Sequence, residues 1–114
     1  MLKLICFVKR NPALSAEQFH QHWRDVHAPL IRNTPGIARH LLSYQQNPRA
    51  AADYVRGEPD WDGVAIACYA DRAAMEALFS EPDYHAHIAP DEQYLSDPDK
   101  TQWILCEEER QVIG

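Results

Sequence analysis

The chain has 114 residues, which suffices for one compact domain with a modest core and is too short for two domains of ordinary size. Hydrophobic residues make up 46% and charged residues 25%, a composition that is typical of a folded globular protein and argues against disorder. The formal net charge is -6 and the eleven Lys and Arg residues are scattered, so we expect no nucleic-acid partner. We interpret residues 1–114 as a single domain.

The chain carries no sign of a membrane segment or a secretion signal. No apolar run approaches the roughly 20 residues of a membrane span, and the N-terminal stretch lacks the apolar region and cleavage site of a signal peptide. Cys6, Cys68 and Cys106 lie far apart within apolar stretches, as buried cysteines of a reducing compartment do. We therefore expect a cytoplasmic protein with no membrane partner.

The first predicted element is a strand at residues 2–10. Leu2, Leu4, Cys6 and Val8 alternate with Lys3, Ile5, Phe7 and Lys9. These two sets point to opposite faces of a strand, and both contain apolar residues, so the strand is predicted to be at least partly buried on both faces.

A helix is predicted to start at about Ala16, because Ser15 and Gln18 have the spacing of a capping box. Its apolar stripe is predicted to consist of Phe19, Trp23, Val26 and Leu30. Pro29 has no backbone N–H, so the helix is predicted to stop or kink there.

The rest of the chain continues this alternation of strands and helices. The further predicted elements are a strand at 37–46, an exposed connection at 47–63, a strand at 64–70, a helix capped by Asp71, a short helix with turns within 81–99, and a strand at 101–113. The order βαββαβ predicts an α+β, ferredoxin-like fold with both helices on one face of a four-stranded antiparallel sheet. The other face would be bare and apolar, so we expect a homodimer.

His27 is the main candidate for chemistry. It lies at the edge of the apolar stripe in the last helical turn, where burial favours the neutral ring and unpaired carbonyls favour the charged ring. Such a residue suits general acid or base catalysis. The alternative is a structural histidine that donates to a backbone carbonyl.

A cavity is predicted beneath this helix. Ala65 and Ala67 are short side chains on the same strand face as Tyr69, so they leave space opposite Trp23 for a small molecule. The alternative is tight packing of alanines against bulky helix residues. On the second strand we favour the face of His40 and Tyr44, rather than that of Leu41 and Ser43, as inward-facing.

Metal and nucleotide sites are disfavoured. Two pairs of histidines are each separated by two positions, His20 with His22 and His85 with His87. Residues two apart on a helix point in different directions and cannot bind one ion together. No further ligands occur at a recognised spacing. No phosphate-binding glycine motif or nucleophile elbow is present. We therefore expect no metal and no cofactor. Charges in 106–110 are interpreted as protection of an edge strand.

Several segments together resemble the EthD-type proteins of the dimeric α/β-barrel group. The similar segments are LSAEQFHQHWRDVHAPLI at 14–31, the PG turn at 35–36, WDGVA at 61–65, PDEQYLSD at 90–97 and ILCEEERQVI at 104–113. The resemblance implies a ferredoxin-like dimer with a cavity between sheet and helices in each subunit. EthD-type proteins accompany oxidative breakdown of small organic molecules, and the wider group includes cofactor-free monooxygenases, isomerases and cyclases.

The resemblance also implies roles for particular residues. The helix histidine of the family corresponds to His27, and its acidic pair to Asp91 and Glu92. Tyr94 replaces the more usual Phe, and Ile66 and Cys68 stand where many relatives carry an acidic and a large aromatic residue.

Three functions remain open from the sequence. The first is a cofactor-independent enzyme in which His27, with Asp91 orienting it, moves a proton on a small aromatic, phenolic or polyketide-like molecule; Trp23, His40, Tyr44, Ala65, Ala67, Tyr69 and Glu92 would bind the substrate. The second is a non-catalytic carrier of an apolar metabolite that assists an oxidative pathway. The third is haem binding through a histidine.

Overall fold

The computed structural model describes residues 1–114. Its elements in chain order are β1 (Leu2–Val8), α1 (Ala16–His22), the π-helical turn η1 (Trp23–His27), α2 (Ala28–Asn33), α3 (Pro35–Ala38), β2 (Ser43–Pro48), the 3₁₀ turn η2 (Ala51–Tyr54), β3 (Gly63–Tyr69), α4 (Arg72–Ser80), the π-helical turn η3 (Tyr84–Ile88), α5 (Ala89–Leu95) and β4 (Gln102–Cys106).

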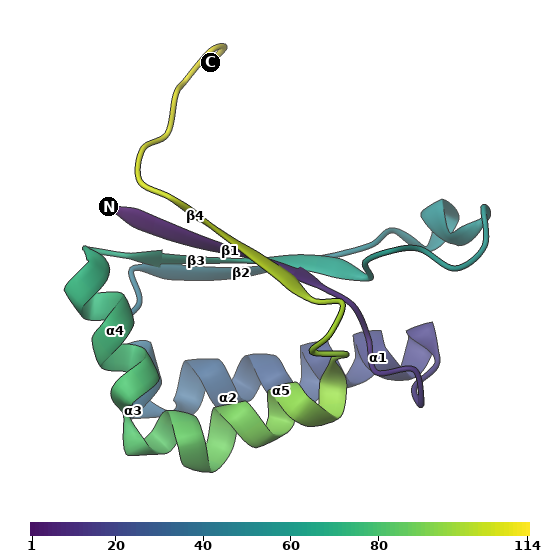
Figure 1. Cartoon of the computed structure of the whole chain (residues 1–114), viewed down its shortest axis with the longest axis horizontal. Coiled ribbons are helices and arrows are strands. Elements are labelled where there is room, and N and C mark those ends of the chain that lie inside the picture. Colours follow the sequence, from purple (N-terminus) through teal and green to yellow (C-terminus); the bar gives the residue numbers. More distant parts are fainter.

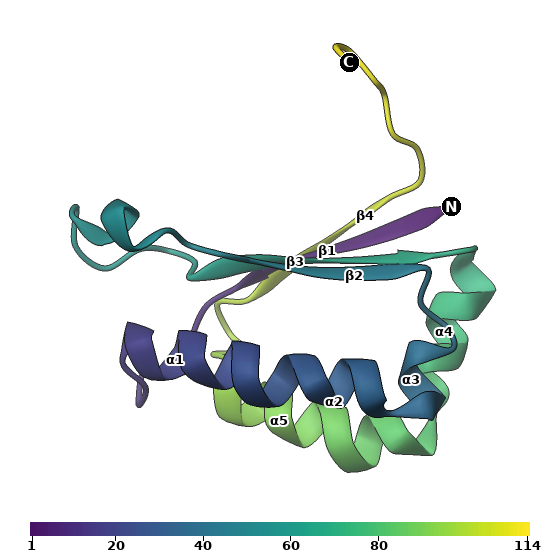
Figure 2. The ribbon, with the colours of Figure 1, turned by 180° about the vertical axis from the view of Figure 1, so that it is seen from behind.

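The four strands form one antiparallel sheet in the order β2-β3-β1-β4. All the α-helices lie on one side of this sheet, and the other side carries no helix (Figure 1; Figure 2). The chain thus has the predicted α+β, ferredoxin-like βαββαβ arrangement. Its layers are a sheet and a helical layer, with the apolar core between them.

The strand register determines which residues face the helices. Leu4 on β1 lies opposite Ala67 on β3 and Leu105 on β4, while its neighbour Ile5 lies opposite Ile66 and Ile104. Because paired residues point to the same face of a sheet, Leu4 and its partners belong to the helix side and Ile5 and its partners to the bare side. Both faces of the sheet centre are therefore apolar, as the sequence predicts.

The sequence predicted that the first long helix stops or kinks at Pro29, and it does not stop there. The chain remains helical to Asn33, because η1 lets the N–H of Ala28 donate to the carbonyl of Trp23, five residues back. Pro29 then falls in the first turn of α2, directly after the π-helical turn, and the helix continues past it. The predicted start at Ala16 is confirmed: Ser15 and Gln18 form a complete capping box.

The second helical segment repeats the same device. In η3 the N–H of Ala89 donates to the carbonyl of Tyr84, and Pro90 follows in the first turn of α5. Each long helix therefore contains one π-helical turn followed by Ala-Pro. Asp71 caps α4 as predicted, accepting a hydrogen bond from the N–H of Ala74 at 2.8 Å.

Two strand boundaries differ from the sequence prediction. Residues 35–38 form the short helix α3, which Pro35 starts, and β2 begins only at Ser43. The last strand ends at Cys106, so Glu107 and the following charges lie beyond it. The terminal segment leaves the sheet on the side opposite the helices (Figure 1).

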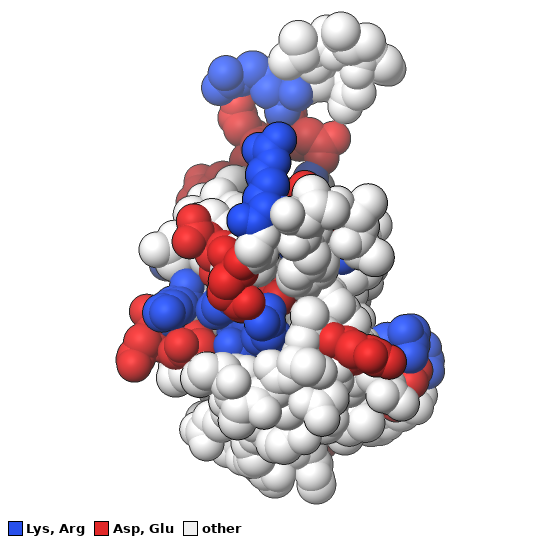
Figure 3. All heavy atoms as spheres, turned by 90° about the vertical axis from the view of Figure 1, so that its right-hand side faces the viewer, with Lys and Arg blue, Asp and Glu red and all other residues white.

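The connection 49–62 is not wholly exposed as predicted. Asp62 is fully buried and accepts from the backbone N–H of Arg10 at 3.0 Å, from Arg10 Nη1 at 2.6 Å and from the hydroxyl of Tyr54 at 2.8 Å. Basic and acidic side chains lie side by side on this end of the molecule, rather than in a patch of one sign (Figure 3). No helix of the structure is both long and apolar enough to span a bilayer.

Candidate functional site

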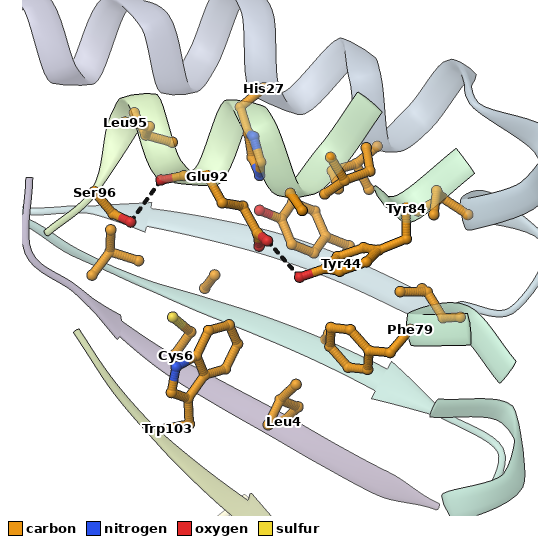
Figure 4. A pocket seen from close by; sticks show the side chains of 18 of the residues that line it. Leu4, Cys6, His27, Tyr44, Phe79, Tyr84, Glu92, Leu95, Ser96 and Trp103 are labelled. Atoms are coloured by element: carbon orange, nitrogen blue, oxygen red, sulfur yellow. Dashed lines mark hydrogen bonds between the residues drawn. The ribbon is translucent and has the colours of Figure 1, made fainter. Parts of the chain in front are cut away.

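A cavity of about 300 Å³ lies between the sheet and the helical layer (Figure 4). Its sheet side includes the short side chains of Cys6, Ala65 and Ala67, which leave the space that larger residues would fill. Aromatic rings surround this space from several elements. They are Trp23 (η1), Tyr44 (β2), Tyr69 (β3), Phe79 (α4), Tyr84 (η3) and Trp103 (β4).

Trp23 is held at the cavity by close packing on the sheet. A Cβ atom at Gly63 would lie 2.6 Å from a carbon of the indole ring, so only glycine permits this approach. Phe19 packs against the Trp23 ring, with ring centroids 5.4 Å apart. The side-chain amide of Gln46 donates to the carbonyl of Trp23 at 3.1 Å. The close approach explains why glycine follows Trp61 and Asp62 at the entry to β3.

His27 points from the helical layer toward the sheet and into the cavity (Figure 4). Its Nδ1 lies 2.7 Å from Oδ2 of Asp91 on α5. An ionised carboxylate only accepts hydrogen bonds, so Nδ1 of His27 is the donor and Nε2 of the neutral ring keeps a free lone pair. The side chain of His27 is only 5% exposed. This arrangement places a proton acceptor in an apolar cavity.

The same carboxylate holds a second imidazole. Nε2 of His22 lies 2.6 Å from Oδ1 of Asp91, the oxygen that His27 leaves free. Burial by itself would raise the pKa of Asp91, but the hydrogen bonds and charges of His27 and His22 outweigh it and lower that pKa below its ordinary value. Asp91 is therefore ionised at neutral pH.

Glu92, the next residue in α5, has the opposite environment. Its carboxylate lines the cavity and accepts a hydrogen bond from the hydroxyl of Tyr84 at 2.6 Å. Burial raises the pKa of Glu92 and outweighs the lowering effects of the Tyr84 hydrogen bond and of His27. The cavity therefore holds a carboxyl group that takes up a proton more readily than an exposed glutamate.

The remaining polar groups of the cavity stay protonated at neutral pH. Burial raises the pKa of Tyr44 and of Tyr69 to about 12 in each case. Burial also raises the pKa of the Cys6 thiol to about 12, so this cysteine is not a thiolate nucleophile. The phenol groups can donate hydrogen bonds to a ligand, and Cys6 acts as a small apolar lining residue.

The structure places most of the predicted site residues around one space. Trp23, His27, Tyr44, Ala65, Ala67, Tyr69 and Glu92 all line the cavity. Asp91 lies behind His27 and reaches the cavity only through it.

His40 does not line the cavity, contrary to the inward orientation expected for it. It precedes β2 and its Nε2 lies 2.8 Å from a carboxylate oxygen of Glu81. The expected alternation failed because α3 and the turn after it replace the first half of the predicted strand. Tyr44, which does lie in β2, lines the cavity.

Sequence reasoning missed Tyr84 and His22 as parts of this site. The signal for Tyr84 was the second Ala-Pro pair: Tyr84 and Trp23 each precede such a pair by five residues, and each is the first residue of a π-helical turn. No sequence signal connects His22 with Asp91, because the contact joins two helices.

Metal ligands are not grouped in the structure. No set of three or more His, Cys, Asp or Glu side chains is arranged to hold a metal ion. His85 and His87 are exposed and do not line the cavity. Among the histidines considered for haem, only His27 faces the cavity, and its Nδ1 is already bound to Asp91.

Comparison with known families decides the relationship of the chain. A sequence model of the EthD domain matches residues 11–99, which include both helical segments and the whole His22, His27, Asp91 cluster. The chain belongs to the EthD family. Comparison of this EthD-family chain with the curated proteins finds no significant match.

Solved structures share the fold of this EthD-family chain at low sequence identity. An ethyl tert-butyl ether D (EthD) family protein from Bacillus halodurans is 20% identical, with a TM-score of 0.70 over 96% of this chain and 99% of that chain. A dimeric ferredoxin-like protein from Thermobifida fusca is 15% identical, with a TM-score of 0.62 over 92% and 88%. A point mutant of SnoaB, a cofactor-independent oxygenase from Streptomyces nogalater, is 15% identical, with a TM-score of 0.63 over 97% and 95%.

Proposed function

We propose that this EthD-family protein is a cofactor-independent enzyme that removes a proton from a small aromatic, phenolic or polyketide-like molecule. The observation that carries the proposal is the position of His27, whose Nδ1 is fixed by Asp91 at 2.7 Å while its ring lines an apolar cavity. A base held in the correct tautomer, out of bulk water, is what proton abstraction from a weak acid requires.

The chemical step starts with the substrate's carbonyl or phenol group in the cavity. His27 Nε2 takes the proton from the carbon next to the carbonyl, or from the phenol oxygen, and leaves an enolate or phenolate. The imidazolium formed is then paired with Asp91. Return of the proton to another atom gives an isomer, whereas reaction of the enolate with dioxygen gives an oxygenated product. The hydroxyl groups of Tyr44 and Tyr69, which stay protonated at neutral pH, can donate hydrogen bonds to the developing oxygen charge.

The cavity also supports an apolar substrate class. Its lining is dominated by aromatic and aliphatic side chains, and buried Tyr44 and Tyr69 offer hydroxyl groups among them. Flat apolar molecules with one or two oxygen substituents match such a surface. SnoaB, whose fold is similar, is described as a cofactor-independent oxygenase, which supports chemistry without a bound cofactor.

The second candidate function is a non-catalytic carrier of an apolar metabolite. The apolar lining favours it, because such a surface binds a ligand whether or not a base is present. The carrier and the enzyme share the cavity and differ only in what His27 does.

A homodimer is part of the proposal. Ile5, Phe7, Ile66 and Ile104 lie on the sheet face that carries no helix, and Ile104 is 48% exposed. A second copy packed on this face would remove these side chains from water. The dimeric state of the ferredoxin-like protein from Thermobifida fusca supports this assembly.

The test uses anthrone as a probe, because its carbonyl acidifies the adjacent ring methylene. We expect the native protein to catalyse exchange of the methylene protons in D₂O under nitrogen, measured by NMR. The His27→Gln variant should lose about 10²-fold or more of the exchange rate while keeping the affinity measured by fluorescence quenching. Unchanged exchange in His27→Gln, or no exchange by the native protein despite binding, would leave the carrier function.

Binding in the cavity is tested separately with matched variants of β3. Ala67→Leu fills the space beneath the helices and should weaken anthrone binding about tenfold or more. Ile66→Leu changes the adjacent residue on the opposite sheet face and should leave the affinity unchanged. Equal affinities of the native protein and Ala67→Leu would place the ligand elsewhere.

A further inference from the structure

Two imidazoles share one carboxylate at the edge of the cavity. Asp91 binds His27 through Oδ2 at 2.7 Å and His22 through Oδ1 at 2.6 Å. The two histidines differ in their access to water: the side chain of His27 is 5% exposed and that of His22 is 21% exposed. His22 is therefore the member of this cluster that exchanges protons directly with solvent.

The position of His22 is fixed by two contacts with α5. Its ring lies against that of Tyr94 on α5, with centroids 4.7 Å apart, and its Nε2 faces Asp91 on the same helix. The titratable groups that face His22 are thus Asp91 and Tyr94 from α5 and, across the carboxylate, His27 from η1. The charge of His27 also interacts with Glu92 from α5 inside the cavity. Asp91 is the ionised group that both imidazoles contact.

The shared carboxylate couples the two rings electrostatically. When His27 accepts a proton in the cavity, the negative charge of Asp91 stabilises the imidazolium. When His22 is protonated as well, its positive charge offsets that of Asp91 and repels the second cation. A proton on one ring therefore makes a proton on the other less favourable, and the two sites titrate as a pair.

We propose that His22 is a positioning residue that controls the basicity of His27 through Asp91 and so makes the buried base respond to the pH of the solvent. This inference rests on the proposed role of His27 as a base, and it adds a residue outside the cavity to the site. With neutral His22 the base is at full strength, and with protonated His22 it is weakened. The expected signature is a loss of proton abstraction on the acid side that is broader than the titration of a single isolated base.

A purely structural role for His22 makes a different prediction. If His22 only tethers α1 to α5, any side chain that donates to Oδ1 of Asp91 would replace it without altering the protonation of His27. Gln is the suitable replacement, since its Nε2 can donate a hydrogen bond from a similar position and carries no titratable charge. His22→Gln thus keeps the hydrogen bond to Asp91 and removes the titratable charge.

The experiment is an NMR titration of the protein labelled with ¹⁵N in its histidine rings, in the native chain and in His22→Gln. We expect the His27 signals of the native chain to follow two pH steps. In His22→Gln the step caused by His22 should be absent, and the step of His27 itself should move to higher pH by about half a pH unit or more, while the effect of Glu92 stays the same in both proteins. The control is His20→Gln, which removes an imidazole from the same helix that contacts Tyr54 and not Asp91; its His27 titration should match that of the native chain.

The outcomes separate this inference from the proposed function. Identical His27 titrations in the native chain and His22→Gln, with unchanged backbone spectra, would overturn the coupling. Coupled titrations in a protein that never exchanges the protons of anthrone would uphold the coupling and refute the enzymatic function. Where exchange occurs, its loss on the acid side should extend over a wider pH range in the native chain than in His22→Gln.

Discussion

Asp91 and Glu92 are adjacent in the chain but have opposite electrostatic environments. Asp91 accepts hydrogen bonds from two imidazoles, and these lower its pKa despite burial. Glu92 has burial as its strongest influence, so its pKa is raised although Tyr84 donates to it. Neighbouring carboxyl groups whose pKa values are moved apart in this way are characteristic of sites that separate an acid role from a charge-pairing role.

The raised pKa of Glu92 predicts that Glu92→Gln stabilises the protein at neutral pH. The folded state holds the Glu92 proton more tightly than the unfolded state, so stability falls as pH rises from the ordinary value of 4.5 through the raised folded value. Gln removes this loss and its carbonyl oxygen can still accept from Tyr84. Thermal unfolding followed by circular dichroism should show a higher Tm for Glu92→Gln at pH 7, with the difference vanishing at about pH 4.

The control is Asp91→Asn, which should change Tm at pH 7 in the opposite direction to Glu92→Gln. The lowered pKa of Asp91 contributes stability that is present above its ordinary value of 3.8 and is lost as pH falls through the lower folded value. Asn should therefore lower Tm at pH 7, and the difference should shrink in acid. If Glu92→Gln and Asp91→Asn shifted Tm in the same direction at pH 7, the assigned environments would be wrong.

Single residues of the site could be predicted from the sequence where the repeat of a helix or a strand determines which face of that element a side chain lies on. His27 and Trp23 share the apolar stripe of one helix, and Ala65 and Ala67 share one face of a strand, so both sets could be placed without coordinates. The contact of Asp91 with two histidines could not be predicted from local periods, because it depends on how α5 lies beside α1. Val26 was assigned to the stripe and is 42% exposed.

The π-helical turns explain why Val26 was wrongly assigned to the buried stripe. Along the first helical segment the side chains at Phe19, Trp23, His27 and Ile31 are buried, in steps of four residues. An ideal α-helix repeats every 3.6 residues and would rotate such a series away from the sheet. The wider turn η1 compensates for this rotation, which is why a search for α-helical spacing selected Val26 and Leu30 instead.

The connection between β2 and β3 is held by a buried ion pair, so its removal should be severe. Asp62 is fully buried between Arg10, Tyr54 and Lys9, whose Nζ is 3.7 Å away. Asp62→Ala leaves the Arg10 guanidinium without its buried partner and should lower the free energy of unfolding by about 3–5 kcal/mol. Urea denaturation followed by tryptophan fluorescence measures this change.

Glu58→Ala is the matched control for Asp62→Ala. Glu58 also contacts Lys9 and Arg10, but its side chain is 60% exposed, so water replaces much of what the pair contributes. Its loss should therefore lower the free energy of unfolding much less than Asp62→Ala does. Equal effects of Asp62→Ala and Glu58→Ala would show that burial of Asp62 does not govern the connection.

At the scale of the whole molecule, one sheet face lacks a cover and the terminal segment lies on that same side. Residues 107–114 leave β4 away from the helices (Figure 2), and Val112 and Ile113 are 85% and 90% exposed. The sequence predicted this apolar bare face because both the odd-numbered and the even-numbered residues of β1 and β3 are largely apolar. Alternate residues of a strand point to opposite faces, so the pattern indicates burial on each face separately. It did not predict the direction of the terminal segment, which was interpreted as part of the last strand.

A homodimer through this face predicts a specific change of mass. Native protein at micromolar concentration should sediment with about twice the chain mass of 13.1 kDa. Ile66→Asp places a charge near the centre of the face in both copies, so desolvation and mutual repulsion should weaken association at least about 100-fold and give the mass of one chain. Val26→Asp, at an exposed position of the helical layer, should remain dimeric. A native protein that sediments as a single chain, or an Ile66→Asp variant that keeps the double mass, would contradict the assembly through the bare face.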